Sequence, residues 1–313
     1  MDRKRRPTSH VGMTRREFMA AAAAAVAVPQ LTPADSVPPL LDLHQHTNYV
    51  GRTDEQLVAH QAFHSVTTTV LLPGAGWMLS ELGDNASCAA VQANYPHLFV
   101  RFACSDVAES RTVDVLRGNI HRGAIGFGEL KFHVAVDSPE MHRVYKLAEE
   151  LGVPVLMHFE FEMYNTGIER FESILKAYPQ VSFLMHAQTW WANISADLDS
   201  AVLYPTGPVK PGGLSDRLLS DYPNIFGDLS AGSGANALTR DPDFTRGFLQ
   251  RHSRKLIWGS DCHCLNGRGE GNGDGLCIAT KSLAALKKYS PDAEAYRRIT
   301  YENGAELLKL NRS

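Results

Sequence analysis

The sequence predicts a single-domain α/β protein, a (β/α)8 TIM barrel, and three observations support this. Eight short apolar segments alternate with segments of helical periodicity over about 270 residues, close to the roughly 250 residues of such a barrel. Two connections that follow predicted strands, 190–213 and 262–275, are long and rich in Gly, Pro and aromatic residues. No stretch has the composition of a linker. A doubly wound open sheet would alternate in the same way, but barrel enzymes build their sites at the C-terminal strand ends, where both long connections begin.

The strands are predicted at the eight apolar segments, which are 40–46, 66–72, 98–104, 124–132, 153–159, 181–187, 224–230 and 255–261. Helices are predicted between them, for example over 53–64, 138–151 and 167–178. The second of these begins with Ser138 and Pro139, an N-cap residue followed by proline at the first helical position. Each strand is therefore followed by a segment able to return the chain to the start of the next strand.

The first 27 residues resemble a twin-arginine export signal. A basic stretch, the pair Arg15 and Arg16, an apolar run from Ala20 to Val28 and small residues at 25–27 follow one another in the expected order. The run is shorter than the roughly 20 residues of a membrane span. The resemblance implies passage through the twin-arginine translocase to the periplasm or the exterior, with no membrane anchor. The alternative is a basic tail on a cytoplasmic protein.

The rest of the chain divides into a Pro-rich lead-in over 28–39 and the barrel over 40–313. Of the 313 residues, 44% are hydrophobic and 21% are charged, as in soluble globular proteins. Without residues 1–27 the chain carries 25 basic and 32 acidic side chains, a net charge of -7. Such a body lacks the basic surface that neutralises phosphates, which disfavours nucleic acid and favours a small-molecule substrate. The oligomeric state stays open, a homo-oligomer included.

Metal-binding side chains stand at the ends of five predicted strands. They are His44 and His46 on the first strand, Glu129 and Lys131 on the fourth, His158 on the fifth, His186 on the sixth and Asp261 on the eighth. Because side chains alternate along a strand, His44 and His46 share one face, which in a barrel is the interior. One histidine in an apolar strand is more often a core residue than a ligand, but four at strand ends favour a metal site. Imidazole and carboxylate without cysteine indicate a catalytic divalent ion, with Zn favoured over Mn, Fe or Ni.

This order of H-x-H, Glu or Lys, His, His and Asp resembles the amidohydrolase superfamily of metal-dependent barrels, with amidohydrolase-2 and TatD-like features. The segment 301–308 resembles the last helix of that family, and the resemblance covers about residues 40–310. It implies that His44, His46, His158 and His186 bind one or two divalent ions. It also implies that Asp261 is a ligand and accepts a proton from the activated water, as the chemistry of metal-assisted hydrolysis requires.

The resemblance implies hydrolysis of an amide, ester, lactone or phosphoester bond in a small molecule. The first alternative is a metal-dependent decarboxylase or hydratase on the same barrel. A TatD-like nuclease is a further alternative, opposed by the acidic charge and the export signal. The last is a non-catalytic metal-binding barrel, opposed by Asp261, because a pure binding site needs no general base.

The fourth strand offers two candidates for one position. Glu129 resembles the bridging glutamate of the TatD branch, whereas Lys131, two residues on and facing the same way, resembles the carboxylated lysine of other branches. Glu129 is favoured because it is already anionic. Lys131 then pairs with Glu129 or contacts the substrate, and the site holds a single ion if neither residue bridges.

Substrate contacts are expected from the loops after strands six and seven. The candidates are Gln188, Trp190, Trp191, Lys210 and Arg240, with Asp228, Ser230 and Ser233 as further polar contacts. Around Lys210 the loop has the composition of a lid, with aromatic rings to stack on a substrate ring and an ammonium to meet a carboxylate. Asp42 is expected either behind a metal-bound imidazole or as a buried hydrogen-bonded acid. His133, Glu160, Glu162 and His263 are reserve candidates for acid-base or contact roles.

The five cysteines are expected to be structural. Cys88 and Cys104 have the pattern of small core residues, while Cys262, Cys264 and Cys277 flank a Gly-rich loop and include candidates for a disulfide. The odd number leaves at least one thiol unpaired.

Overall fold

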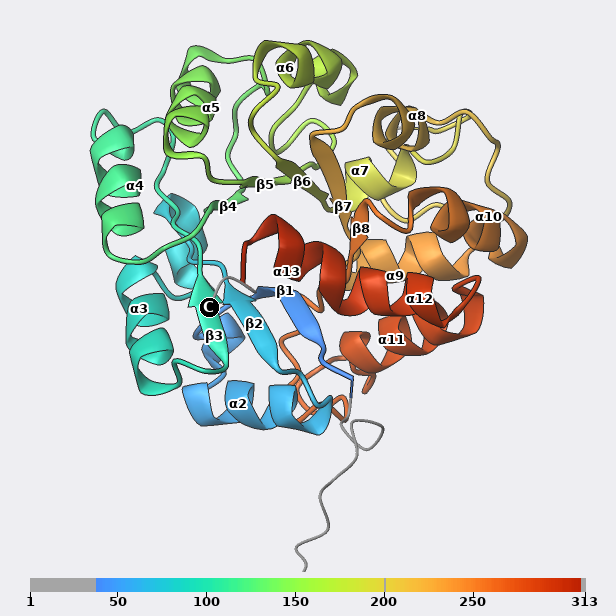
Figure 1. Ribbon diagram of the computed structural model, residues 1–313, viewed down its shortest axis with the longest axis horizontal. Helices are drawn as coiled ribbons and strands as arrows, with labels where there is room; N and C mark the ends of the chain where they lie inside the picture. The colour runs from blue at the N-terminus through green and yellow to red at the C-terminus, as the bar shows by residue number, and fades with distance from the viewer. Residues whose placement is uncertain (1–37, 200, 311–313) are drawn as a thin grey trace, which may run out of the picture. The chain divides into compact units, whose positions relative to one another are not determined.

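The computed structural model describes residues 38–199 and 201–310. The predicted export signal and almost all of the lead-in therefore lie outside the described residues. In the described part, parallel strands occupy the centre and helices surround them (Figure 1). None of the described helices has the length and apolar character needed to cross a bilayer.

All eight predicted strands are present, each shorter than its apolar segment. They are β1 (Leu41–Gln45), β2 (Thr68–Leu71), β3 (Phe99–Arg101), β4 (Phe127–Leu130), β5 (Val155–His158), β6 (Phe183–His186), β7 (Ile225–Asp228) and β8 (Leu256–Ile257). Neighbours in sequence pair in parallel, in one sheet of order β1-β2-β3 and a second of order β4-β5-β6-β7-β8. Backbone hydrogen bonds join the sheets, with Gly128 N donating to Ala103 O over 2.9 Å on one side and Leu43 N to Trp258 O over 3.2 Å on the other. The predicted α/β barrel is confirmed, with two sheets in place of one continuous ladder.

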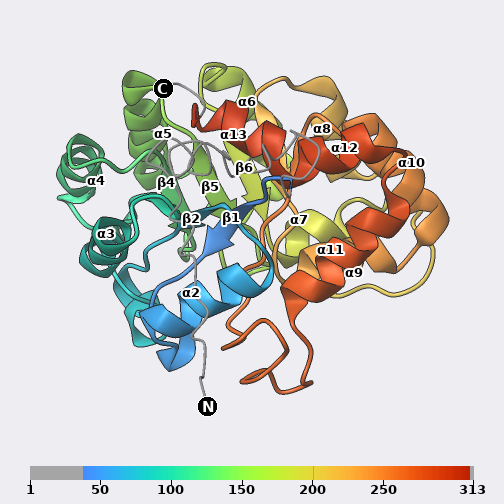
Figure 2. The same cartoon turned by 60° about the horizontal axis from the view of Figure 1, so that its bottom comes forward.

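Helices follow the strands in the predicted alternation, as Figures 1 and 2 show. They are α2 (Asp54–Phe63), α3 (Asn85–Asn94), α4 (Thr112–His121), α5 (Pro139–Leu151), α6 (Phe171–Ala177), α7 (Gln188–Ala192), α8 (Leu214–Asp221), α9 (Ala231–Thr239), α10 (Pro242–His252), α11 (Ile278–Tyr289), α12 (Ala293–Arg297) and α13 (Asn303–Leu307). Short 3-10 helices are η2 (Tyr49–Gly51), η3 (Gly76–Ser80) and η4 (Ile168–Arg170), and η5 (Arg298–Glu302) is a π-helix. The predicted start of α5 is confirmed, because Ser138 Oγ accepts a hydrogen bond from Met141 N and Pro139 is the first helical residue.

The amino-terminal ends of the strands enclose an apolar core that α13 covers. This core consists of Leu41, Leu43, Val70, Leu72, Phe102, Leu156, Leu184, Ile257 and Leu308. Gly304 lets α13 approach closely, since a Cβ atom there would lie 2.9 Å from Leu41 Cδ2 and 3.2 Å from Ile257 Cγ2. With that end filled and covered, polar side chains have space only at the carboxyl ends of the strands.

Side chains add to the few backbone hydrogen bonds between the last strand and the first, at a boundary that we call the β8–β1 seam. Asp42 accepts hydrogen bonds from the backbone N and the Oγ of Ser260, over 2.7 and 2.5 Å. Gln45 Nε2 donates to Cys262 O over 3.1 Å, and the buried Arg52 donates to Cys262 O over 2.6 Å and to Cys264 O over 3.2 Å. Asp42 is therefore the buried hydrogen-bonded acid of the two alternatives, and it does not lie behind an imidazole.

Candidate metal centre

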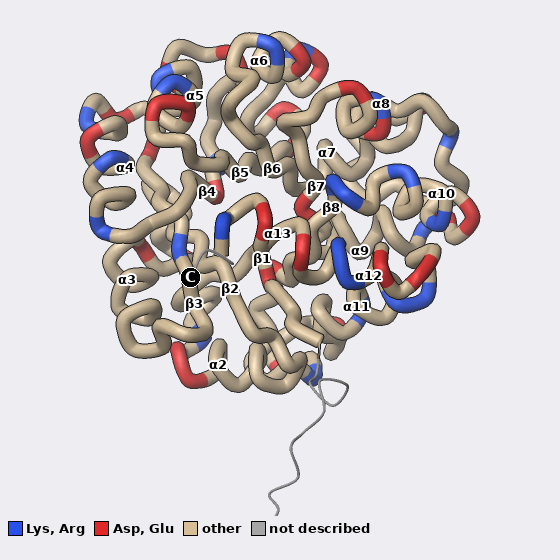
Figure 3. The backbone as a smooth tube through the Cα atoms, viewed as in Figure 1, with Lys and Arg blue, Asp and Glu red and all other residues tan. Residues whose placement is uncertain are grey.

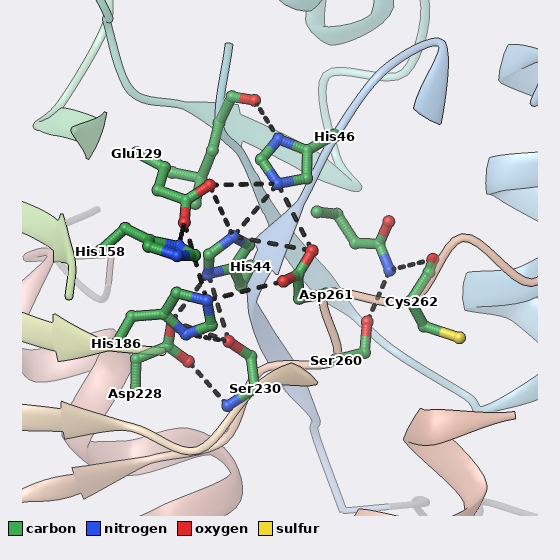
Figure 4. Close-up of polar contacts among 12 residues, drawn as sticks. His44, His46, Glu129, His158, His186, Asp228, Ser230, Ser260, Asp261 and Cys262 are labelled. Carbon is green, nitrogen blue, oxygen red and sulfur yellow. Dashed lines mark hydrogen bonds and ion pairs between the residues drawn. The ribbon is translucent and has the colours of Figure 1, made fainter. Parts of the chain in front are cut away.

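Five of the predicted metal ligands converge at the carboxyl ends of the strands: His44, His46, Glu129, His186 and Asp261 (Figure 4). The Nε2 atoms of His44 and His46 lie 3.1 Å apart, and Glu129 Oε2 lies 3.7 Å from each. Asp261 Oδ1 lies 3.8 Å from His44 Nε2 and 3.5 Å from His46 Nε2. His186 Nε2 lies 3.7 Å from Glu129 Oε1 and 3.6 Å from Asp261 Oδ2. These residues form two overlapping groups that share His44, one with Glu129 and His186 and one with His46 and Asp261, and each group could hold an ion.

These separations fit a divalent cation. Nitrogen and oxygen ligands about 2.0–2.2 Å from one ion lie about 3.0–3.5 Å from each other, close to the observed values. Asp261 Oδ1 is buried and has no hydrogen-bond partner among the described residues, as expected for an atom that binds an ion. Three imidazoles and two carboxylates form the ligand set of catalytic Zn, Mn or Fe sites, so the residues fit the predicted ion.

Hydrogen bonds orient the three imidazoles so that each Nε2 atom faces the centre. His46 Nδ1 donates to Leu72 O over 2.7 Å, and His44 Nδ1 donates to Asp228 Oδ2 over 2.7 Å. Ser230 Oγ lies 2.9 Å from His186 Nδ1 and donates to Asp228 Oδ2. Occupied Nδ1 atoms leave the Nε2 lone pairs for the ion, which is the usual arrangement of histidine ligands. Asp228 was predicted only as a polar contact, and it takes the place behind an imidazole that was considered for Asp42.

The structure does not bring His158 or Lys131 into the group of five. His158 Nδ1 donates to Glu129 Oε1 over 2.5 Å, and its Nε2 atom lies 3.3 Å from Glu160 Oε2, so both ring nitrogens face carboxylates. His158 thus orients Glu129. Lys131 lies beside the group and forms no ion pair among the described residues; its ammonium lies over the rings of Trp77 and Tyr164. Of the two candidates on strand four, Glu129 is the one that reaches the cluster.

Both carboxylates of the cluster are held ionised. Burial opposes the charge of Asp261, but the charge of His44 and the nearby imidazoles of His186 and His46 lower its pKa well below the ordinary value. Burial likewise opposes the charge of Glu129, and the charge and hydrogen bond of His158 lower its pKa well below the ordinary value. Burial disfavours the charged form of His44, yet Asp261 and Asp228 raise its pKa well above the ordinary value. The two ionised carboxylates supply the negative charge that attracts a cation.

The cluster opens into a small cavity of about 50 Å³. Its lining residues are His46, Tyr49, Trp77, Met78, Glu81, Leu82, Glu129, Lys131, His158 and Asp261. Trp77 stacks on Tyr164 with ring centroids 5.2 Å apart, and Lys131 Nζ lies 5.2 Å and 5.1 Å from the two centroids. Burial and the negative charges of Asp261 and Glu129 raise the pKa of the Tyr49 hydroxyl well above its ordinary value. The sequence analysis missed Trp77, Tyr164 and Tyr49, which lie in loops whose course it did not predict.

The predicted substrate contacts lie elsewhere. Trp190 and Trp191 are buried in the hydrophobic core, because α7 begins directly after His186 and turns both rings inward, so neither ring can stack on a substrate. Trp191 Nε1 instead donates to Asp228 O over 2.9 Å and so holds the residue that orients His44. Gln188 Nε2 donates to Tyr204 Oη over 3.5 Å.

The loop cations and the reserve candidates are also separate from the cluster. Lys210 is exposed, and Arg240 lines a different hollow of about 280 Å³ with Asp197 and Thr206. Another hollow, of about 510 Å³, includes Glu160 and Glu162 but none of the five converging residues. His133 Nδ1 donates to Met163 O, and the ring of His263 lies 5.6 Å from that of Tyr49.

Solved structures of similar fold support the barrel architecture. A probable 2-pyrone-4,6-dicarboxylic acid hydrolase from Acinetobacter baumannii, with citric acid bound, superposes with a TM-score of 0.58 at 16% identity, over 86% of this chain and 99% of that one. A 2,6-dihydroxybenzoate decarboxylase from Rhizobium gives 0.54 at 12% identity, over 88% and 99% of the chains. A dihydroxybenzoic acid decarboxylase from a Polaromonas species, with bound manganese and the inhibitor 2-nitroresorcinol, gives 0.53 at 12% identity, over 88% and 98%. At these identities the likeness shows the fold alone.

The sequence comparison is decisive for the family. No curated protein matches this chain significantly in sequence. The family model described as amidohydrolase matches residues 49–310, which include the ends of seven of the eight strands and all ligand candidates except His44 and His46. The chain therefore belongs to the amidohydrolase family.

Proposed function

We propose that the protein is a metal-dependent hydrolase that cleaves an amide, ester, lactone or related bond in a small molecule. One observation carries the proposal: His44, His46, Glu129, His186 and Asp261 converge beside a cavity, and the buried Asp261 Oδ1 has no hydrogen-bond partner among the described residues. A single divalent ion, with zinc favoured and manganese as the alternative, is the cofactor that these ligands suit best. Membership of the amidohydrolase family supports the same chemistry.

The residues of the chain divide the work of hydrolysis between them. An ion held by the cluster would polarise the scissile carbonyl and make water more acidic. Asp261 lines the cavity and is ionised, so it can accept the proton of the attacking water and pass it to the leaving group. His158 holds Glu129 in place, and Asp228 orients His44.

Lys131 and the ring of Trp77 indicate a substrate that carries a carboxylate on a planar group. Both residues line the cavity, and the ammonium forms no ion pair with a described carboxylate. A carboxylate would satisfy that charge, and an indole face accepts a planar ring. The names of two structural neighbours, a pyrone dicarboxylic acid hydrolase and a dihydroxybenzoate decarboxylase, describe carboxylated rings as well. In Figure 3, basic and acidic residues are interspersed over the outer helices, which favours a small substrate over nucleic acid.

The second candidate is a decarboxylase or hydratase on the same site. The decarboxylases among the structural neighbours favour it, because they share the barrel. Here the ion and Lys131 would hold the substrate carboxylate, and Asp261 would deliver a proton to carbon. The two candidates differ in product rather than in site geometry.

A substrate screen separates the candidates. Panels of carboxylated esters, amides and lactones are assayed for hydrolysis, and aromatic acids for release of carbon dioxide, with the zinc and manganese forms of the protein. Hydrolysis that falls by a factor of about 10²–10⁴ in Asp261→Asn supports the proposal. Carbon dioxide release with a silent hydrolysis panel supports the decarboxylase, and an active Asp261→Asn protein contradicts both.

Lys131→Met tests the substrate class. Loss of a charge-assisted hydrogen bond worth about 1.5–3 kcal/mol should lower kcat/KM for carboxylated substrates by about 10–100-fold. Substrates without a carboxylate should react as before. Lys210→Met is the matched control, since Lys210 is an exposed lysine outside the cavity. Equal losses in both variants, or for both substrate types, would contradict recognition of the carboxylate by Lys131.

We further propose that residues 1–27 direct export through the twin-arginine translocase, on the sequence pattern alone. Arg15→Lys combined with Arg16→Lys should retain the protein in the cytoplasm, as cell fractionation with the full chain would measure. An unchanged distribution between the fractions would contradict export by this route.

A further inference from the structure

A second group of metal-binding side chains lies outside the candidate metal centre. His60, on α2, meets Cys262, Cys264 and Cys277 from the loop between β8 and α11. All four residues are buried, and their potential ligand atoms lie within 4.8 Å of one another. In Figures 1 and 2 this loop, drawn in orange, lies beside α2. The cluster joins segments about 200 residues apart, so the spacing of the cysteines alone does not predict it.

The separations within the cluster suit a tetrahedral zinc ion. Cys262 Sγ lies 3.8 Å from Cys277 Sγ, and His60 Nε2 lies 3.4 Å from Cys277 Sγ. Zinc bonds of about 2.3 Å to sulfur and 2.0–2.1 Å to nitrogen place tetrahedral ligands about 3.8 Å and 3.5 Å apart. Three cysteines and one histidine with no open position form the ligand set of a structural zinc site.

Neighbouring groups are arranged as they are around bound thiolates. Gly269 N donates to Cys264 Sγ over 3.0 Å, and Asn272 Nδ2 lies 3.9 Å from Cys262 Sγ. His60 Nδ1 lies 3.4 Å from Gln61 Oε1, which leaves its Nε2 atom free for an ion. Such contacts to the far side of the ligands fix their orientation in metal sites.

The charge around the cluster is also balanced for an ion. Zinc with three thiolates and a neutral imidazole has a net charge of about -1, which is costly to bury alone. The buried guanidinium of Arg52 donates to the carbonyls of Cys262 and Cys264 and supplies the opposite charge. An apolar side chain in place of Arg52 would not supply this positive charge.

A disulfide explains less of the arrangement. A bond between Cys262 and Cys277 would use two of the four ligands and leave the Cys264 thiol and His60 buried beside it. The loop over 262–277 has no helix or strand of its own, and a loop of this length is uncommon unless something holds it. An ion bound by both ends of the loop and by α2 would hold it in place.

We propose that His60, Cys262, Cys264 and Cys277 form a structural zinc site that fixes the loop between β8 and α11 to α2. This site is separate from the candidate metal centre and does not depend on the reaction that the protein catalyses. Because Asp261 immediately precedes Cys262, the ion would also hold the backbone that carries the general base.

Cobalt substitution combined with metal analysis tests the site in the full-length protein. The wild-type protein should hold one equivalent of metal in each site. Cobalt bound by thiolates gives a sulfur-to-metal charge-transfer band and intense visible bands of tetrahedral coordination, which the candidate metal centre cannot give because it lacks sulfur. Cys264→Ser and His60→Gln should each lose one equivalent of metal and weaken or lose these bands. Cys88→Ser, a buried cysteine outside the cluster, is the matched control and should keep both.

Thiol counting keeps the test decisive even if a variant fails to fold. Wild-type protein unfolded with chelator should react with five equivalents of thiol reagent, the full number of cysteines. Three equivalents would mean a disulfide and overturn the proposal. Cobalt protein without the charge-transfer band, or zinc content unchanged in Cys264→Ser, would also overturn it. A variant that loses activity but keeps the metal of the cysteine cluster would test the proposed function and would not contradict the structural zinc site.

Discussion

The Nε2 atoms of His44 and His46 lie 3.1 Å apart, although each ring already uses its Nδ1 atom in a hydrogen bond. In their neutral forms the two rings therefore point lone pairs at each other across a distance at which they repel. A proton or a metal cation between them removes the repulsion. The pair is thus a receptor for a positive charge and the core of the candidate metal centre.

Removal of that charge should destabilise the folded protein. We expect dialysis against a chelator to lower the unfolding temperature, and zinc to restore it; a ligand at 100 times its Kd stabilises by about 2.7 kcal/mol. In His46→Gln the part of the zinc stabilisation that is due to the candidate metal centre should disappear. His97 is exposed, and His97→Gln should respond to zinc like the wild type. Differential scanning calorimetry checks this. Identical zinc responses of His46→Gln and the wild type would contradict the assignment.

Asp228→Asn should weaken metal binding at the candidate metal centre by about 10–100-fold, because Asp228 accepts the Nδ1 hydrogen of His44 over 2.7 Å. Competition with a chromophoric chelator measures the affinity. Asp216→Asn is the matched control, since Asp216 forms a similar contact of 2.6 Å with His252 Nε2 but belongs to no cluster of metal-binding residues. It should lose stability and keep its metal affinity. Equal affinity losses in the two variants would show that Asp228 acts only through the fold.

Gly304→Ala should destabilise the barrel by about 1–3 kcal/mol, because the added Cβ would meet Leu41 and Ile257 in a filled core. Gly247→Ala in α10 has only the end of Arg251 nearby, at 3.3 Å, and should stabilise by about 0.5–1 kcal/mol through helix propensity. Urea unfolding gives both values. The same sign for the two substitutions would contradict the packing of α13 against the strands.

Glu172 should link stability to pH in the acid range. Tyr222, Lys176 and Arg217 donate hydrogen bonds to it and lower its pKa from 4.5 to about 2. A pKa lowered by folding means that the stabilisation is complete above about pH 4.5 and is lost as the pH falls towards 2. The difference in unfolding free energy between wild type and Glu172→Gln should shrink across that window.

The control for this prediction is Glu109→Gln, an exposed glutamate with no side-chain hydrogen bond among the described residues. It should leave the unfolding free energy unchanged at every pH in the same titration with urea. A difference between Glu172→Gln and wild type that stayed constant from pH 6 to pH 3 would show that the charge of Glu172 is not the stabilising feature.

The sequence predicts the elements that regular periodicity determines. It does not predict the side chains whose positions depend on the course of the loops. Eight apolar segments are sufficient to place the strands, and alternation along β1 is sufficient to pair His44 with His46. Trp190 and Trp191 were expected at a substrate, but the local fold of α7 buries them. Trp77 is exposed in the short 3-10 helix η3, where no pattern marks it as a cavity wall.

Long-range contacts account for the other differences. Asp42 and Asp228 are both strand carboxylates, and only the packing of β1 against β7 and β8 decides which one meets His44. The cysteine cluster depends on His60, which the periodicity of α2 describes merely as a buried helix position. Sequence spacing contains no information about a partner that lies 200 residues away.

The β8–β1 seam has a consequence for the order in which the protein matures. His44, His46 and His60 leave the ribosome early, whereas Asp261 and the three loop cysteines are among the last parts to emerge. Both proposed ions need ligands from the two groups, so neither site can be complete on a partly synthesised chain. Metal binding would then follow synthesis of the whole chain and would join the last strand to the first. In a cell short of zinc, full-length chains would accumulate in which these two strands are not yet held together.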